Sequence, residues 1–227
     1  MSGNVIINNL PFLMQGLFVT LKVAFISIIL SMVLGTFLGI IRYFKVPVIS
    51  KLIGLFIDIT RSIPLILYII FIHFSISPYL YRYVDFLRYI GLDCLEMYSA
   101  ILAIVIFTAA YIAEIVRSGF ESIEHEQIFA AKALGLNNSQ MMEYIILPQA
   151  ISRMKPALCA QFVTLVKDTS LASAIGLIEL TRAAEIIYET QFHEFQLLIY
   201  VAFIYILINF LIQRLFYTRN SIDFNGK

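Results

Sequence analysis

The amino-acid sequence predicts an all-α membrane protein with about five transmembrane helices. Hydrophobic residues make up 60% of the 227 residues and charged residues only 14%, whereas soluble domains have roughly a half and a quarter. The mean hydropathy of +0.88 agrees with a membrane composition. The apolar residues gather in stretches that can cross about 30 Å of hydrocarbon as helices. Residues 117–171 contain the longest polar interruption.

The first expected span covers about residues 17–41. It contains Gly35 and Gly39, whose spacing allows close helix packing in membranes. Three basic residues follow within residues 42–51. Because basic residues beside a span mark the cytoplasmic side, the N-terminus is predicted to lie outside.

The second expected span covers about residues 52–74 and contains two charges and a proline. Asp58 and Arg61 are three residues apart, so they share a helix face and can form an ion pair. Pro64 predicts a kink or a break. Charges within an apolar segment are costly and usually face protein or water. Two interpretations stay open: the pair stabilises the fold, or Arg61 lines a transport path.

The third expected span covers about residues 98–116, after a tyrosine-rich outer loop over residues 75–97 that is expected to include a short interfacial helix. Glu114 lies near the inner end of this span, and Arg117 follows three residues later. The two form either an interfacial ion pair or part of a functional site.

The fourth expected span, about residues 150–166, is short for a full crossing. Residues 174–190 are amphipathic, with acidic and basic residues including Glu179 opposite apolar ones, which predicts a helix lying on the outer surface. The fifth span covers about residues 195–216, and basic residues after it place the C-terminus in the cytoplasm.

Residues 126–135 predict a short, alanine-rich helix that ends at Gly135, a residue that often follows a helix in the left-handed conformation. Asn137 and Gln140 then resemble a capping box that begins a second helix. Pro148 closes that helix or bends the chain into the next one. From these features alone, the segment is either an ordinary connector or a surface that another protein approaches closely.

Residues 117–171 resemble the cytoplasmic loop and following span of permease subunits from type I ABC importers, in the subfamily that takes up polar amino acids. The family carries Gly-Gln-x-Glu-Ala-Ala-x-Ala-Leu-Gly, then Leu-Pro-Gln-Ala, then Lys-Asp-Thr-Ser-Leu. The matching residues are Gln127, Ala130, Ala131, Ala133, Leu134 and Gly135, then Leu147, Pro148, Gln149 and Ala150, then Lys167, Asp168, Thr169, Ser170 and Leu171. Glu126 and Phe129 depart from the pattern, which usually has Gly and Glu there.

The resemblance implies an all-α membrane protein of the type I ABC importer permease fold with a cytoplasmic coupling-helix loop. Residues 1–15 would be an extracytoplasmic segment, residues 16–216 the transmembrane domain with its coupling loop at about 118–148, and residues 217–227 a cytoplasmic tail. The implied partners are a second permease subunit, identical or homologous, two ATP-binding subunits and an extracytoplasmic solute-binding protein. Together they would import a polar amino acid across the bacterial cytoplasmic (inner) membrane by alternating access.

The resemblance and the chemistry of the residues together give the expected site residues. The surface that couples to the ATP-binding subunits is expected to comprise Glu126, Gln127, Phe129, Ala130, Ala131, Ala133, Leu134 and Gly135. The substrate pathway is expected to include Lys167, Asp168, Thr169, Ser170, Arg61 and Glu114. An amino acid carries an ammonium and a carboxylate, so Asp168 offers an acceptor for the first and its neighbours offer donors for the second.

Other chemistry is not indicated. The sequence has no GxxxxGK[ST] phosphate loop, so ATP hydrolysis is expected in a separate subunit. No metal-ligand spacing or cofactor motif is found, and the net charge of +1 does not suggest nucleic acid. Two alternatives stay open. A secondary amino acid transporter would predict inverted repeats and interrupted helices, and a non-transport membrane scaffold would need no polar residues aligned within its spans.

Overall fold

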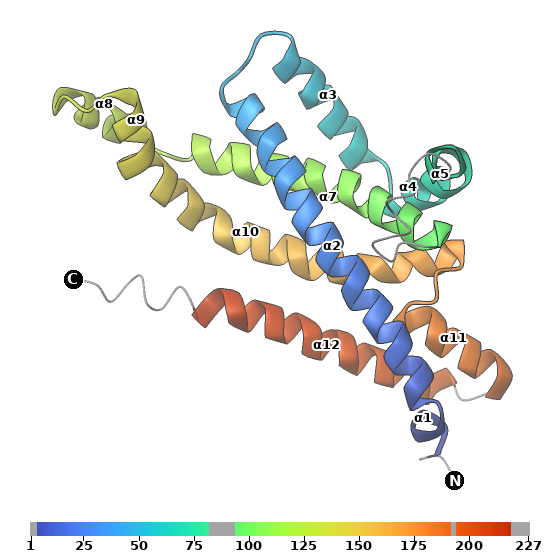
Figure 1. The fold of residues 1–227 in the computed structure, drawn as a ribbon. Coiled ribbons are helices and arrows are strands. Elements are labelled where there is room, and N and C mark those ends of the chain that lie inside the picture. Colours follow the sequence, from blue (N-terminus) through green and yellow to red (C-terminus); the bar gives the residue numbers. More distant parts are fainter. Residues whose placement is uncertain (1–3, 82–93, 192–193, 219–227) are drawn as a thin grey trace. The chain divides into compact units, whose positions relative to one another are not determined.

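The computed structural model describes residues 4–81, 94–191 and 194–218, and the regular structure in these ranges is helical (Figure 1). The α-helices are α1 Asn4–Asn8, α2 Leu10–Tyr43, α3 Ile49–Ser62, α4 Leu65–Phe71, α5 Ser77–Tyr81, α7 Leu95–Glu121, α8 His125–Ala133, α9 Asn138–Met141, α10 Leu147–Asp168, α11 Leu180–Gln191 and α12 Glu194–Thr218. Two π turns, η1 Ile72–Ile76 and η2 Met142–Ile146, and a 3₁₀ segment, η3 Thr169–Ile175, join some of them. The all-α prediction is confirmed.

Three helices of the described chain are long and apolar enough to cross a membrane: α2, α7 and residues Phe195–Phe216 of α12. A fourth candidate is a broken pair, Ile49–Ser62 with Leu65–Tyr79. Helix α10 has 22 residues, which is long enough, but it is more polar and contains Pro156. The second expected span is therefore broken, and the fourth is more polar than the other three.

Pro64 causes the break in the second expected span. It stands before the first residue of α4 with φ −58° and ψ 136°, outside the helical region. Proline also disfavours helical geometry in the residue before it, which is Ile63. Helix α3 therefore ends at Ser62, and the predicted break is confirmed.

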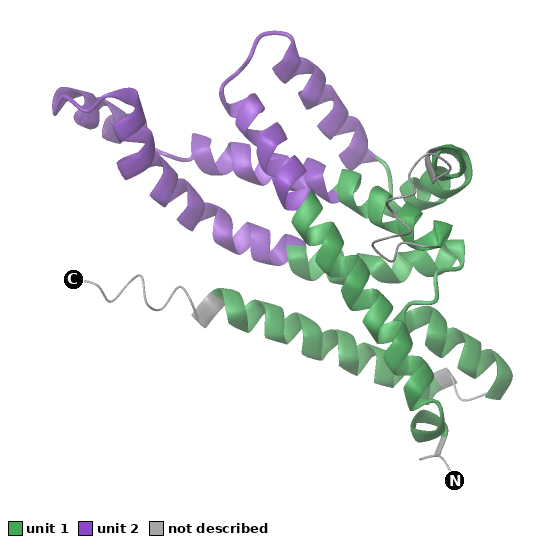
Figure 2. Cartoon of the chain, viewed as in Figure 1, with its two compact units in different colours: residues 1–30, 63–107, 162–227 green, residues 31–62, 108–161 purple. Residues whose placement is uncertain are grey.

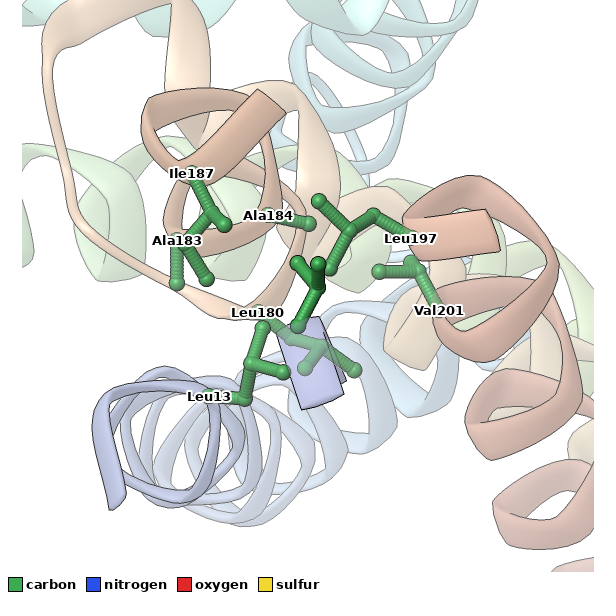
Figure 3. Close-up of a cluster of buried hydrophobic side chains, with 8 residues drawn as sticks. Leu13, Leu180, Ala183, Ala184, Ile187, Leu197 and Val201 are labelled. Carbon is green, nitrogen blue, oxygen red and sulfur yellow. The ribbon is translucent and has the colours of Figure 1, made fainter. Parts of the chain in front are cut away.

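The chain divides into two compact units (Figure 2). Unit 1 comprises Met1–Leu30, Ile63–Phe107 and Phe162–Lys227. One of its cores joins the N-terminal part of α2 to α11 and α12, and Figure 3 shows Leu13, Leu180 and Leu197 converging there. Each of these three side chains is at most 1% exposed.

Unit 2 comprises Ser31–Ser62 and Thr108–Gln161. Within it, α2 approaches α7 closely at two glycines. A Cβ added at Gly35 would lie 2.7 Å from the Cβ of Ile112, and one added at Gly39 would lie 2.6 Å from the carbonyl oxygen of Ala113. The close packing predicted from the glycine spacing is confirmed.

The segment after α10 differs from the expected helix over residues 174–190. The 3₁₀ segment η3 ends before Gly176, whose φ of +85° is left-handed, and α11 begins only at Leu180. Of the expected outer loop, η1 and α5 are helical, which confirms a short helix there. The rest of that loop, residues 82–93, lies outside the described residues.

The polar segment folds as predicted into a helix, a tight turn and a second helix. Gly135 has a φ of +83°, and Asn137 and Gln140 form the capping box, each side chain accepting from the other's backbone N–H at 2.9 Å. Pro148 does not end the second helix. It is the second residue of α10 and follows the π turn η2, whose wider turn accommodates the missing N–H.

Candidate functional site

Helix α8 has an outward face and an inward face. Glu126, Phe129 and Ala130 are exposed, with 66% of the Phe129 surface accessible, and Leu134 just beyond the helix is 80% exposed. These positions recur at the three- and four-residue spacing of one helix face. Ala131 is only 2% exposed and faces inward. The outward face thus combines small and large apolar groups with one acid.

The structure divides the eight residues grouped as a coupling surface. Those that face outward are Glu126, Phe129, Ala130, Ala133, Leu134 and Gly135. Gln127 and Ala131 do not belong to this exposed set. Gln127 is partly buried, and its Oε1 accepts a hydrogen bond from Nε2 of Gln149 at 2.8 Å. The division follows from helical periodicity, because residues four apart lie on the same face of a helix, so Ala131 shares the inward face of Gln127.

The first turns of α10 are anchored to the end of α7 within unit 2, and α8 and α9 lie at the same end of α10 (Figure 1). Arg153 donates a hydrogen bond from Nη1 to the backbone carbonyl of Ser122. Met154 packs directly on Gly119, where an added Cβ would collide with the Met154 side chain. The polar segment between the two helices is therefore held by side chains as well as by its backbone.

Glu114 is bracketed by two arginines. Arg42 of α2 donates to its carboxylate at 2.6 Å, and Nε of Arg117 lies 3.1 Å from each carboxylate oxygen. Arg117 also forms an ion pair with Glu121. The predicted pair between Glu114 and Arg117 is confirmed. Because both oxygens of Glu114 are engaged, the arrangement favours a role in holding α2 and α7 together.

Arg61 does not form the ion pair expected with Asp58. Both side chains are exposed, and the Arg61 guanidinium instead lies 5.0 Å from the ring centroid of Tyr111, a cation–π distance. Arg61, Tyr111, Glu114 and Arg153 help to line an open cavity of about 300 Å³ in unit 2. This volume admits a small polar molecule, and the cavity presents guanidinium groups and hydroxyls to it.

The Lys-Asp-Thr-Ser sequence lies where α10 passes into η3, in unit 1. Thr169 is buried and donates to the carbonyl of Val166 at 2.7 Å, and Ser170 donates to the carbonyl of Lys167 at 2.7 Å. Both hydroxyl protons are therefore used in hydrogen bonds to backbone carbonyls at the end of α10. Lys167 is exposed and Asp168 is partly buried. Within the described chain, the structure records no hydrogen bond or ion pair for Asp168, which leaves its carboxylate available.

The sequence interpretation missed the most buried acid among the residues that the structure describes. Glu179 is fully buried instead of lying on the polar side of a surface helix. Its carboxylate accepts from the backbone N–H groups of Thr181 and Arg182 at 2.9 and 2.8 Å, from the Tyr205 hydroxyl at 3.2 Å, and from Thr20 at 3.4 Å. Burial raises the pKa of this carboxyl above its ordinary value, and the two backbone donors oppose that shift. The one sequence signal for this role was an acidic residue directly before the start of a helix, a position where aspartate and similar side chains cap the backbone N–H groups.

The comparisons with known proteins show which family the chain resembles. The family model described as "Binding-protein-dependent transport system inner membrane component" matches residues 31–218. The probable glutamine ABC transporter permease protein GlnP of Bacillus subtilis is 44% identical over 179 residues, covering 79% of this chain and 77% of the relative. The glutamate/aspartate import permease protein GltK of Escherichia coli is 31% identical over 207 residues, covering 90% of each chain.

Solved structures show the same fold. A crystal structure described as an amino acid ABC transporter with histidines matches with a TM-score of 0.82 and 26% identity, over 97% of this chain and 98% of the other. An inward-facing methionine ABC transporter matches in fold alone, with a TM-score of 0.69 and 22% identity.

The fold and the comparisons define a membrane permease of the type I ABC importer class. The chain belongs to the family of inner membrane components of binding-protein-dependent transport systems, and it is a permease subunit of an ABC importer. The resemblance carried by the three sequence blocks is confirmed. It places the chain among transport subunits and not among catalytic ones.

Proposed function

We propose that this subunit carries a polar amino acid across the bacterial cytoplasmic membrane. The relatives at 44% and 31% identity are named for glutamine and for glutamate and aspartate, which supports a polar amino acid as substrate. Energy enters through two separate ATP-binding subunits, since the sequence has no phosphate-binding loop of its own. A second permease subunit completes the pathway, and an extracytoplasmic solute-binding protein delivers the amino acid.

The outward face of α8 is the surface to which an ATP-binding subunit docks. The observation that carries this proposal is the exposure of Phe129 and Leu134 on a short helix of an otherwise polar loop. Exposed aromatic and aliphatic groups of this kind serve as anchors in protein interfaces. Ala130 between them lets the partner approach closely, and Glu126 supplies an acidic contact where Phe129 has replaced the usual Glu.

The substrate is held by charges of opposite sign along the path. Asp168 accepts the ammonium group, because its carboxylate has no recorded partner in the described chain while the neighbouring hydroxyls of Thr169 and Ser170 are engaged at the helix end. Arg61 contributes a donor for a carboxylate from the cavity in unit 2, and Glu114 acts there by fixing its arginine neighbours. Lys167, exposed beside Asp168, provides a second cation.

Transport then follows alternating access. Binding of ATP closes the two motor subunits, their movement displaces α8, and the spans open outward to receive the amino acid. Hydrolysis restores the inward-open state. Such switching requires that nucleotide and substrate bind the two states with different free energies.

The proposal is tested by reconstituting the complete complex in liposomes. Uptake of radiolabelled glutamine, glutamate, aspartate and arginine is measured with and without ATP and the solute-binding protein. The expected result is uptake of a polar amino acid that needs both. Uptake driven by an ion gradient without ATP would indicate a secondary transporter, and a complex that transports none of them would indicate a scaffold.

A further inference from the structure

A pair of glutamine side chains joins α8 to α10. Nε2 of Gln149 donates to Oε1 of Gln127 at 2.8 Å and also to the backbone carbonyl of Ile145 at 3.0 Å. Both glutamines are partly buried. The amide nitrogen of Gln149 has two protons, so these two bonds use its whole capacity as a donor.

The carbonyl of Ile145 fixes the direction of the pair. A backbone carbonyl can only accept, so the nitrogen of the Gln149 amide, and not its oxygen, must lie beside Ile145. Gln127 therefore presents its oxygen to Gln149. Position 149 requires a donor, whereas position 127 requires only an acceptor.

This bond is the single side-chain hydrogen bond that the structure records between α8 and another element of the described chain. α8 is otherwise joined to its neighbours by short backbone segments, one to α7 and one through Gly135 to α9, and by the packing of its inward face, where Ala131 is 2% exposed. The acceptor lies on the inward face of α8, one residue from Glu126 on the outward face. Force applied to the outward face therefore reaches α10 directly through Gln127.

We propose that the Gln127–Gln149 hydrogen bond makes α8 and the start of α10 move as one body, with Gln149 as a positioning residue for coupling. Helix α10 continues without interruption to Asp168, so the pair lies at one end of the element whose other end carries the proposed substrate acceptor. This inference rests on the proposed function, since it concerns how the docking movement is passed on. It assigns Gln127 to the interior of the permease and not to the contact with the ATP-binding subunit.

The test uses single substitutions in the reconstituted complex that change whether each position can donate or accept a hydrogen bond. Gln127→Glu keeps an acceptor and is expected to retain uptake and stimulated ATP hydrolysis. Gln149→Glu puts a carboxylate against two oxygens and is expected to lower both about threefold to tenfold, the range of a lost neutral hydrogen bond. Gln149→Lys keeps a donor and is expected to retain most activity. Copurification of the ATP-binding subunits is expected to remain at the parent level in all three.

Gln140→Glu is the matched control. It adds the same charge to the same loop, and its side chain only accepts, from the backbone N–H of Asn137. It is expected to behave like the parent. Size-exclusion profiles of the purified complexes show that each variant has assembled.

Three outcomes would overturn the inference. The first is that Gln149→Glu transports as well as the parent, and the second is that Gln149→Lys loses as much activity as Gln149→Glu. The third is that Gln127→Glu loses the ATP-binding subunits, because this would place Gln127 in the docking contact. The proposed docking surface is tested separately by Ala130→Arg. If that variant keeps stimulated hydrolysis, the docking proposal fails whatever the glutamine variants do.

Discussion

At the scale of single residues, Glu179 shows how a buried acid is accommodated at the start of helix α11. Placing a carboxylate in a buried site is costly unless its oxygens are hydrogen-bonded. Here two of the donors are backbone N–H groups in the first turn of α11, which have no partner within the helix. Glu179 therefore serves as the cap of α11 and ties that helix to Thr20 of α2 and Tyr205 of α12.

Replacing Glu179 should loosen this region. Glu179→Ala leaves two buried backbone donors unsatisfied and is expected to lower the free energy of unfolding by about 1–3 kcal/mol, whereas Glu179→Gln keeps one acceptor and should cost less. Thermal unfolding of the purified protein in detergent measures both. Glu185→Ala, which removes a partly exposed ion pair with Arg182, is the control and should change little. A Glu179→Ala protein as stable as the control would show that the cap is dispensable.

Asp168 is the residue on which the proposed substrate contact depends. Asp168→Asn keeps the size of the side chain and removes its charge, so an amino acid's ammonium group loses its ionic partner. Uptake is expected to fall at least tenfold for every amino acid that the parent carries, while assembly and basal ATP hydrolysis stay unchanged. Ser170→Ala, which removes a hydroxyl engaged with the Lys167 carbonyl, should affect uptake less. Unchanged uptake in Asp168→Asn would make Asp168 an anchor of the helix end.

The sequence predicted residue types better than it predicted their directions. The capping box, Gly135 and the Glu114–Arg117 pair depend on neighbours within four positions, so local rules were sufficient. Whether Gln127 faces a partner or the interior depends on Gln149, 22 residues away. The partners of Glu179 on α2 and α12 are likewise remote in sequence, and no local pattern indicates them.

At the scale of elements, α8 is a short helix with two different tasks on its two faces. Ala130→Arg places a long cation on the exposed face and should block close approach of the ATP-binding subunit. Copurification of that subunit, measured on purified complexes, is expected to fall more than tenfold with normal membrane insertion. Ala131→Arg should behave differently, because at 2% exposure the arginine has no room and the protein loses stability. If Ala130→Arg copurifies normally, this face is not the docking surface.

The contact between α2 and α7 depends on two positions without side chains. Gly35→Ala or Gly39→Ala would bring a methyl group within 2.8 Å of α7 atoms, which forces the helices apart. We expect a lower melting temperature for each. Gly54→Ala on α3 is a matched control, since its added Cβ would lie 3.5 Å from the flexible Arg42 side chain, and alanine favours a helix by about 0.5–1 kcal/mol. Equal melting temperatures in all three variants would contradict the close contact.

Helices could be predicted from the sequence where an apolar composition alone determines that a span forms. Helices α2, α7 and α12 each contain a long, strongly apolar stretch, so their existence followed from hydropathy, with ends displaced by several residues. The π turn before Pro148 and the left-handed Gly176 before α11 were not predicted. Many different sequences can adopt each of these backbone geometries, so the residue types alone do not indicate them. Glu179 was placed on a polar face for the same reason: its helix was taken to begin before residue 180.

At the scale of the whole molecule, the orientation of the chain in the membrane depends on α10. Within the described residues, three helices and one broken pair give at most four crossings by length and composition, and an even number of crossings would leave both termini on the same side. Helix α10, with 22 residues, is about 33 Å long and can cross the hydrocarbon. Its charges Arg153 and Lys155 lie in its second and third turns, from which their long side chains can extend toward the interface.

We therefore predict five crossings, with the N-terminus outside and the C-terminus in the cytoplasm. The basic residues within 42–51 and after α12 favour the same orientation. The measurement places a single cysteine at Ser2 or Asn225, in a chain whose native Cys94 and Cys159 are replaced by serine, and labels intact cells with a membrane-impermeant thiol reagent. Ser2→Cys should be labelled in intact cells and Asn225→Cys only after the membrane is opened. Labelling of both positions from the same side would show that α10, or the broken pair at Pro64, does not cross.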